Sequence, residues 1–283
     1  MSFRRISILG LGLIGGSVAM SIKKHLSDCD ITGYDIDAGA IHEALDSGAV
    51  DRVASSLALA CEAAQCIILC VPVGRVGPML AAIAPHLKPG VCVTDVCSTK
   101  QTVGETAHRL LPAGVHFVGS HPMAGGERQG FSAARSDLFD GAICITTPTP
   151  LSDPATVEQV EQFWRQLGME IRRMPADQHD HLVAQISHLP HVLASALVNA
   201  VSDEAMAVAG PGFRDLTRIA ASNDGLWRDI LLDNASEVRR ILKRYQSELV
   251  HLDALLASGH PEDLQSWLAA AALRRKALGK DGG

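Results

Sequence analysis

The chain has 283 residues, carries a formal net charge of −6, and is 47% hydrophobic but only 4% aromatic. This length favours two domains over one. The negative charge argues against a general polyanion binder, and the low aromatic content argues against a surface on which nucleic-acid bases stack. Because no apolar run is long enough to span a bilayer, the sequence predicts no membrane partner either.

The cysteines indicate the compartment. None of them belongs to a C-x-x-C pair, and most lie in apolar runs that are expected to form strands, at positions 29, 61, 66, 70, 92, 97 and 144. This pattern is typical of buried, reduced thiols. We therefore expect a cytoplasmic protein.

The segment 6–17 is predicted to form a short buried strand, a glycine turn and the start of a helix. Its glycines match G-x-G-x-x-G, in which the first allows the tight turn and the second lets a pyrophosphate approach the backbone. The third lets the helix pack close to the strand, and free N–H groups at the helix start hold the phosphates. The predicted dinucleotide-binding residues at this turn are Gly10, Gly12, Leu13, Ile14 and Gly15.

The same segment has a competing interpretation as a secretory signal, because Arg4 and Arg5 precede an apolar run that extends to Ile22. Two observations favour the dinucleotide site. No A-x-A cleavage site follows, and Asp35 stands twenty residues after Gly15, at the end of a second strand-like run. An acidic residue at that distance binds the ribose of a dinucleotide.

Asp35 also predicts which nicotinamide cofactor binds. Its carboxylate can accept hydrogen bonds from the ribose hydroxyls, but it would repel a 2′-phosphate by roughly 1–4 kcal/mol, depending on the effective dielectric constant. No basic residue follows directly to offset this repulsion, since the next residues are Ile36, Asp37 and Ala38. We therefore expect NAD, with NADP disfavoured.

Strand-like and helix-like segments alternate up to about residue 174, which predicts a doubly wound α/β domain over residues 1–174. Beyond the first strand, further strands are expected at 31–35, 66–71, 91–95, 115–119, 142–147 and 169–174. Helices are expected at 38–47, from 73 to about 86, at 98–111 and at 154–167. Ser98 has the residue type of an N-cap for the third of these helices.

Residues 175–283 contain no further strand candidate and are predicted to form an all-α domain. The helical segments are expected at 177–208, 213–221, 226–256 and 267–278, with Pro190 kinking the first of them or lying near a break in it. Ser222 to Asp224 should cap the third, and 279–283 should be a frayed tail. A helical domain this elongated rarely buries its faces alone, so we expect a homodimer formed through these helices.

Candidate chemistry lies where strands end, because the carboxyl ends of parallel strands face the ligand crevice. Val71 and Pro72 end one strand and are predicted to contact the cofactor. Ser98 and His121 follow two others and should lie beside the nicotinamide. The simpler interpretations are that Ser98 only caps a helix and that His121 is a loop histidine satisfied by water.

The helical half is rich in histidine at 179–181 and 188–191. Histidines at near-helical spacing can bind zinc. No cysteine or paired carboxylate completes a ligand set, so we predict no metal. Arg214 and Arg218 stand four residues apart; they could form a solvated pair with Asp215 or a clamp for a carboxylate.

Several sequence blocks occur in order within residues 6–229. They are the glycine turn, Asp95-Val-Cys-Ser-Thr-Lys100, Ser120-His-Pro-Met-Ala-Gly125, Ser187-His-Leu-Pro-His191, and Gly212-Phe-Arg-Asp-Leu-Thr-Arg-Ile-Ala220 with Trp227-Arg-Asp229. No block is decisive alone, but their combination is specific and resembles the prephenate/arogenate dehydrogenase family, which makes tyrosine precursors by oxidative decarboxylation of a cyclohexadienol. One departure is Cys97, where many relatives are expected to have glycine.

The resemblance implies a Rossmann-type domain followed by a helical dimerisation domain, and an NAD-dependent dehydrogenase acting on prephenate or L-arogenate in tyrosine biosynthesis. By matching motif positions it implies that His121 contacts the ring hydroxyl and that Ser98 orients His121. It places His191 and Arg218 in the substrate pocket, with Arg218 binding a carboxylate. His121 suits proton transfer because its ordinary pKa, about 6.5, lies near working pH.

Two alternatives remain at this level. A different two-domain dehydrogenase, of the β-hydroxyacid or imine reductase type, would share the glycine turn, and a non-catalytic dinucleotide sensor would need only the first half. The sequence does not separate prephenate from L-arogenate, although Gly126 and Glu127 are candidates for sensing the difference. Feedback inhibition by tyrosine is also left open.

Overall fold

The computed structural model describes residues 3–126 and 128–278, and the chain divides into two compact units, residues 1–235 and 236–283. The first unit contains an eight-stranded sheet and the helices up to α11. The second contains α13 and all but the first residue of α12. Glu127 and the tail 279–283, both considered above, lie outside the described residues.

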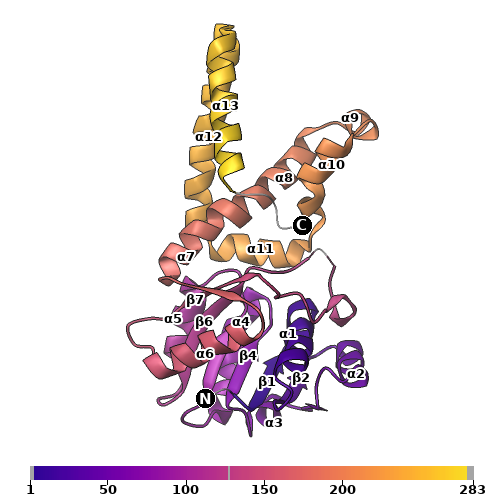
Figure 1. The fold of residues 1–283 in the computed structure, drawn as a ribbon, viewed down its shortest axis with the longest axis vertical. Coiled ribbons are helices and arrows are strands. Elements are labelled where there is room, and N and C mark those ends of the chain that lie inside the picture. Colours follow the sequence, from indigo (N-terminus) through magenta and orange to yellow (C-terminus); the bar gives the residue numbers. More distant parts are fainter. Residues whose placement is uncertain (1–2, 127, 279–283) are drawn as a thin grey trace. The chain divides into compact units, whose positions relative to one another are not determined.

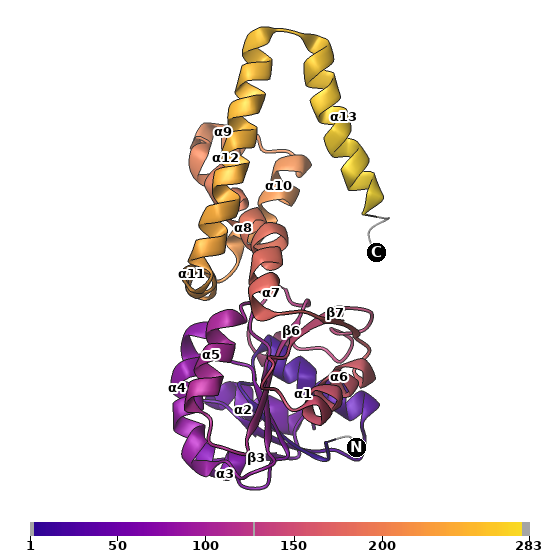
Figure 2. The same cartoon turned by 90° about the vertical axis from the view of Figure 1, so that its left-hand side faces the viewer.

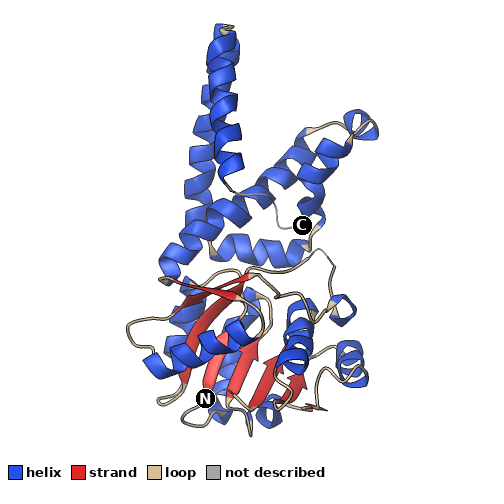
Figure 3. Ribbon diagram, in the orientation of Figure 1, coloured by secondary structure: helices blue, strands red, loops and turns tan. Residues whose placement is uncertain are grey.

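The sheet of the first unit has the strand order β3-β2-β1-β4-β5-β6-β7-β8 (Figures 1 and 3). All neighbouring strands are parallel except β6 and β7, which are antiparallel. The strands are β1 (Arg5–Leu9), β2 (Asp30–Tyr34), β3 (Arg52–Val53), β4 (Cys66–Leu69), β5 (Cys92–Asp95), β6 (His116–Pro122), β7 (Ile143–Thr147) and β8 (Glu170–Arg173). The predicted α/β domain is confirmed, and the short β3 is an addition.

Both faces of the sheet are covered, which explains why its central strands are continuous apolar runs. Successive side chains point to opposite faces. Ile68 therefore belongs to the core shared with α1 and α6, whereas Ile67 and Leu69 belong to the core shared with α4 and α5. The helices of this part are α1 (Leu13–His25), α2 (Ala38–Asp46), α3 (Leu57–Cys61), α4 (Val73–Ile83), α5 (Gln101–Leu110) and α6 (Pro154–Gln166).

No strand is assigned among the described residues after β8, as predicted. The helices that complete the first unit are α7 (Ala176–Val183), α8 (Leu189–Ala200), α9 (Asp203–Ala207), α10 (Pro211–Thr217) and α11 (Asp224–Asp233). A π-helical turn, Ala184–His188, separates α7 from α8 and ends two residues before Pro190. A proline has no N–H to donate to the preceding turn, so the interruption lies where the sequence predicted a kink.

The prediction of one continuous helix over 226–256 is wrong. The helix is interrupted at Asn234, between α11 and α12 (Ala235–Ser258). Asn234 is buried, and its amide donates hydrogen bonds to the Asp180 carbonyl oxygen at 2.8 Å and toward His188 Nδ1 at 3.3 Å. Apolar periodicity continues through the break and could not reveal these contacts.

In the second unit, α12 and α13 (Pro261–Ala277) diverge from their connection near Gly259 (Figure 2). The described part of α13 has no buried residue. Within the described residues, no helix is both long enough and apolar enough to cross a membrane.

Candidate functional site

The glycine turn joins β1 to α1, and each of its glycines meets a different constraint. Gly10 has φ +103°, and a side-chain Cβ there would lie 2.3 Å from the Cys70 carbonyl oxygen. A Cβ on Gly15 would lie 1.8 Å from the Gly10 carbonyl oxygen, so the helix could not approach the turn. A Cβ on Gly12 would meet nothing within 4 Å. The second glycine therefore faces open space, where a pyrophosphate could approach the backbone.

The start of α1 suits the same anion. Its N-cap residue is Gly12, which has no side chain that could cap the first N–H groups of the helix. The first turn of the helix holds no acidic residue. The Asp35 carboxylate holds the turn in place, because Oδ2 accepts from the Leu11 N–H at 2.5 Å and Oδ1 from the Asp37 N–H at 2.9 Å. These residues fit a dinucleotide, which needs a helix start with available N–H groups for its phosphates and an acidic residue for its ribose.

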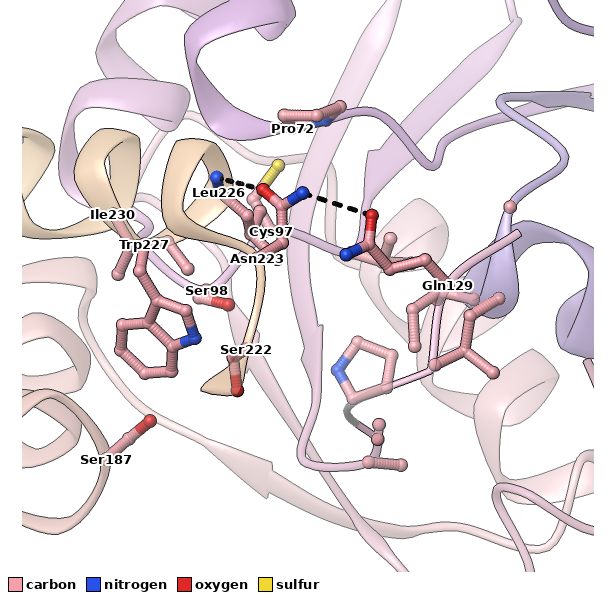
Figure 4. A pocket seen from close by; sticks show the side chains of 18 of the residues that line it. Pro72, Cys97, Ser98, Gln129, Ser187, Ser222, Asn223, Leu226, Trp227 and Ile230 are labelled. Atoms are coloured by element: carbon pink, nitrogen blue, oxygen red, sulfur yellow. Dashed lines mark hydrogen bonds between the residues drawn. The ribbon is translucent and has the colours of Figure 1, made fainter. Parts of the chain in front are cut away.

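A pocket of about 700 Å³ extends from this turn to the helices α8 and α11. Figure 4 shows part of its wall, with Ser98 and Trp227 among the lining residues and a hydrogen bond between Gln129 and Asn223. Eight of the twelve predicted site residues line the pocket, and so does Gly126. The eight are Gly12, Leu13, Ile14, Val71, Pro72, Ser98, His121 and Arg218.

The four other predicted site residues lie around this pocket. Gly10 and Gly15 shape the turn, and Asp35 holds it. His191 is buried, and its ring stacks on Trp227 at a centroid distance of 3.6 Å and an interplanar angle of 8°. Trp227, whose role the sequence left open, lines the pocket.

His121 belongs to strand β6, not to the loop in which it was expected. It pairs with Ile145 of the antiparallel strand β7. The preceding residue, Ser120, is fixed by its N–H donating to Asp95 Oδ1 at 3.1 Å and by the Trp164 indole N–H donating to its hydroxyl at 3.0 Å. The backbone that carries His121 is thus more rigidly held than a loop would be.

Two residues of α7 continue from His121 in a chain of hydrogen bonds. His121 Nδ1 lies 2.8 Å from His179 Nε2, and His179 Nδ1 lies 2.7 Å from Asp180 Oδ1. All three side chains are buried. Burial lowers the pKa of His121 well below its ordinary value, and the neighbouring His179 and the Lys100 ammonium lower it further.

Asp180 also caps the helix α5, so the prediction that Ser98 is the N-cap of this helix is wrong. The helix after β5 begins at Gln101, not at Ser98. Its first N–H groups are capped by the Asp180 carboxylate, which accepts from Lys100 N at 2.8 Å and Gln101 N at 2.9 Å. Ser98 therefore lies in the turn before the helix and lines the pocket. A cap supplied by another helix leaves no signal in the local sequence.

The turn that carries Ser98 is built on a buried ion pair between Asp95 and Lys100, both fully buried. Asp95 Oδ2 also accepts from the Cys97 N–H at 3.0 Å. A buried charge is tolerated only when it is paired and hydrogen-bonded, as here. Because no described residue other than glycine has a positive φ, Cys97 is accommodated where glycine was expected.

Arg214 and Arg218 are both exposed, and of the two Arg218 lines the pocket. Arg214 donates to the Ala209 carbonyl oxygen at 3.3 Å. The helix α10 ends between them, at Thr217, and a 3₁₀ turn, Arg218–Ala221, follows it directly. Within the described residues, no cluster of His, Cys, Asp and Glu is arranged to hold a metal ion.

Two family models match consecutive parts of the chain. Residues 18–173 match the prephenate dehydrogenase nucleotide-binding domain, and residues 175–270 match the prephenate dehydrogenase dimerization domain. Among characterised relatives, the cyclohexadienyl dehydrogenase of Zymomonas mobilis is 35% identical over 286 residues, covering 99% of this chain and 97% of the relative.

Solved structures of a prephenate dehydrogenase and an arogenate dehydrogenase are also similar to this chain. The prephenate dehydrogenase of Aquifex aeolicus in complex with hydroxyphenyl propionate and NAD+ is 30% identical, with a TM-score of 0.93 and 99% of each chain covered. The arogenate dehydrogenase of Synechocystis is 30% identical, with a TM-score of 0.84, covering 97% of this chain and all of that one.

Proposed function

The chain belongs to the prephenate dehydrogenase family, and on that premise we propose that it catalyses the oxidative decarboxylation of prephenate, L-arogenate or both. It is an NAD-dependent oxidoreductase with a Rossmann-type domain. The observation that carries the proposal is the pocket itself, because one cavity joins the glycine turn, His121 and Arg218. A dinucleotide sensor would not need the last two.

The cofactor would be held by the glycine turn and the start of α1, with Asp35 at its ribose and Val71 and Pro72 beside it. When bound, NAD supplies the acceptor for the hydride that leaves C4 of the substrate ring. The open space at Gly12 and the uncapped α1 terminus support this placement. Ser98 shares the pocket with His121 and would contact the same end of the cofactor.

His121 is the proton acceptor in this proposal. Its side chain lines the pocket and is neutral, because burial lowers its pKa well below 6.5. A neutral imidazole can take the proton of the C4 hydroxyl as C4 is oxidised. Loss of the ring carboxylate as CO₂ leaves its electron pair on the new aromatic ring, so the phenolic oxygen regains a proton. His121 can return the proton it took.

Arg218 would bind a substrate carboxylate and so orient the ring. It and Arg128 are the charged residues among the described lining of the pocket, and both are cationic. This charge favours substrates that carry two carboxylates, as both prephenate and L-arogenate do. His191, held in plane by Trp227, is proposed to contact the substrate at the same end.

The test is NADH production with prephenate, L-arogenate and a panel of hydroxy acids. Turnover of one or both cyclohexadienols, and of no hydroxy acid, is the expected result. His121→Asn should lower kcat by about 10²–10⁴-fold while NAD binding persists. NAD binding without turnover of any substrate would instead favour the sensor, and turnover of hydroxy acids would favour the other dehydrogenase class.

We also propose a domain boundary at residues 174 and 175, a homodimer formed through the C-terminal helices, and a cytoplasmic location. The boundary falls between the two matched family segments, and the second of these is a dimerization domain. All seven cysteines are free thiols, which supports a reducing compartment.

A further inference from the structure

The hydrogen-bond chain behind His121 decides which of its nitrogens can accept a proton. We propose that His179 and Asp180 are positioning residues that fix the His121 tautomer, with hydrogen on Nδ1 and the Nε2 lone pair left for the substrate. The proposal deepens the function proposed above, and it rests on that function only for its effect on turnover.

The Asp180 carboxylate accepts hydrogen bonds at both of its oxygens. Each of its oxygens accepts a backbone N–H, Oδ1 from Lys100 and Oδ2 from Gln101. Although burial raises the pKa of this carboxyl, the hydrogen bonds from His179 and these amides outweigh burial and hold the pKa below its ordinary value. An ionised carboxylate only accepts. The hydrogen between Asp180 Oδ1 and His179 Nδ1 therefore belongs to His179.

His179 is the next residue in the hydrogen-bond chain. A neutral imidazole has one donor nitrogen and one acceptor nitrogen. Burial lowers the pKa of His179 despite the hydrogen bond to Asp180, so the ring is neutral. With its hydrogen on Nδ1, His179 must accept at Nε2. The 2.8 Å contact then requires His121 to donate from Nδ1. The acceptor nitrogen left on His121 is Nε2.

An imidazolium at His121 needs a linked anion, because several groups near it disfavour positive charge. They are His179 on α7, Lys100 after β5 and His188 of the π-helical turn. The Lys100 charge is paired with Asp95, and the Cys144 thiol of β7 is buried and neutral. Asp180 is the anion linked to His121, through neutral His179. Its charge can stabilise the imidazolium formed when Nε2 takes the substrate proton.

Asp180 itself is located by three elements. It lies on α7, its side chain caps α5, and its carbonyl oxygen accepts from the buried Asn234 at the end of α11. The tautomer of His121 is thus tied to the packing of the helices on the sheet. A residue that merely filled space at position 179 would not need an acceptor nitrogen facing His121.

The test compares His179→Gln with His179→Leu. Glutamine keeps an acceptor oxygen for His121 Nδ1, whereas leucine has a similar volume and no acceptor. We expect His179→Leu to lower kcat by about 10²–10⁴-fold with little change in NAD affinity, and His179→Gln to recover at least tenfold of that loss. The same substitutions at His108, an exposed histidine of α5, are the controls and should leave kcat unchanged.

The tautomer can be measured directly by ¹⁵N NMR of histidine side chains in the enzyme without substrate, with His121→Asn identifying the resonance. The expected result is hydrogen on Nδ1 of His121 in the wild-type enzyme and a mixture of tautomers in His179→Leu. Hydrogen on Nε2 in the wild-type enzyme, or equal kcat for wild type and His179→Leu, would overturn the proposal. Should the wild-type enzyme turn over neither cyclohexadienol, the spectrum with hydrogen on Nδ1 would still support the relay, while the proposed function would fail.

Discussion

At the scale of single residues, the three glycines of the turn match one motif but do different physical work. Gly10 and Gly15 are required by the fold, because a side chain at either would collide with backbone. Gly12 is not required by the fold, because space beside it is open. Under the proposed placement of the cofactor, glycine is needed at this position because the pyrophosphate approaches the backbone there. Substitution of Gly10 or Gly15 should therefore affect the stability of the fold, whereas substitution of Gly12 should affect cofactor binding.

We therefore expect Gly15→Ala to change mainly the melting temperature and Gly12→Ala to change mainly the affinity for NAD. Gly15→Ala should lower the melting temperature substantially, since the added methyl group would force the turn and helix apart. Gly12→Ala should fold with nearly wild-type stability but bind NAD at least tenfold more weakly, because the methyl group occupies the approach of the pyrophosphate. Thermal unfolding and NAD titration check both. Equal NAD affinity in Gly12→Ala and wild type would contradict the placement of the cofactor.

Asp35 predicts a preference for NAD over NADP, and one substitution at this position should weaken that preference. Asp35→Asn removes the charge but keeps an oxygen for the Leu11 N–H. The ratio of kcat/KM for NAD to that for NADP should fall by about fivefold or more, because a repulsion of roughly 1–4 kcal/mol is removed. Asp46→Asn, at the exposed far end of α2, is the matched control and should keep the wild-type ratio. A preference of the wild-type enzyme for NADP would contradict the prediction that Asp35 disfavours the 2′-phosphate.

At the scale of elements, buried neutral histidines connect the helices to the sheet. His188 lies in the π-helical turn, is fully buried and accepts from Asn234. Burial lowers the pKa of His188 to about 4. In the unfolded chain the pKa returns to about 6.5, so between these values the unfolded state binds more protons. Stability is therefore full above pH 6.5 and is lost as pH falls toward 4.

The loss attributable to His188 is on the order of a few kcal/mol. His188→Gln removes the titrating group while keeping an acceptor for Asn234. We expect the fall in melting temperature between pH 7.5 and 4.5 to be smaller in this variant than in wild type. Some fall should remain, because burial also lowers the pKa of His121, His179 and His191. If both proteins lose the same number of degrees, His188 does not couple stability to pH.

At the scale of the whole molecule, the second unit leaves apolar residues uncovered. The described part of α13 buries none of its residues, although most helical stability in proteins comes from packing an apolar face against a neighbour. Exposed apolar side chains of α12 and α13 are Leu249, Val250, Leu256, Leu268 and Leu273. A second copy of the chain would cover them, in agreement with the match to a dimerization domain.

The expected outcome is a dimer in light scattering after size exclusion. Replacing Leu256 and Leu273 together with lysine should shift it toward monomer, because two charges would be buried without partners. Leu151→Lys is the control, since this leucine of the first unit is equally exposed. A wild-type monomer, or a double variant that remains dimeric at all concentrations, would contradict this interface.

The sequence by itself determined the cofactor and the class of fold, because both depend on local spacing. A glycine turn followed by Asp35 at the end of the next strand is readable from residues close together in the chain. The apolar runs fix strands in the same way. The blocks around Ser98, His121, His191 and Arg218 were recognisable as a set, and the structure brings Ser98, His121 and Arg218 to one pocket.

Only the tertiary structure decided how His121 is held. His179 lies 58 residues from it in the sequence, and no motif links the two. The cap of α5 by Asp180, the break at Asn234 and the antiparallel pairing of β6 with β7 are likewise contacts between distant segments. Periodicity and spacing report what a residue does to its near neighbours in the chain. Hydrogen bonds between buried groups form wherever packing brings a donor to an acceptor, and that is decided by the whole fold.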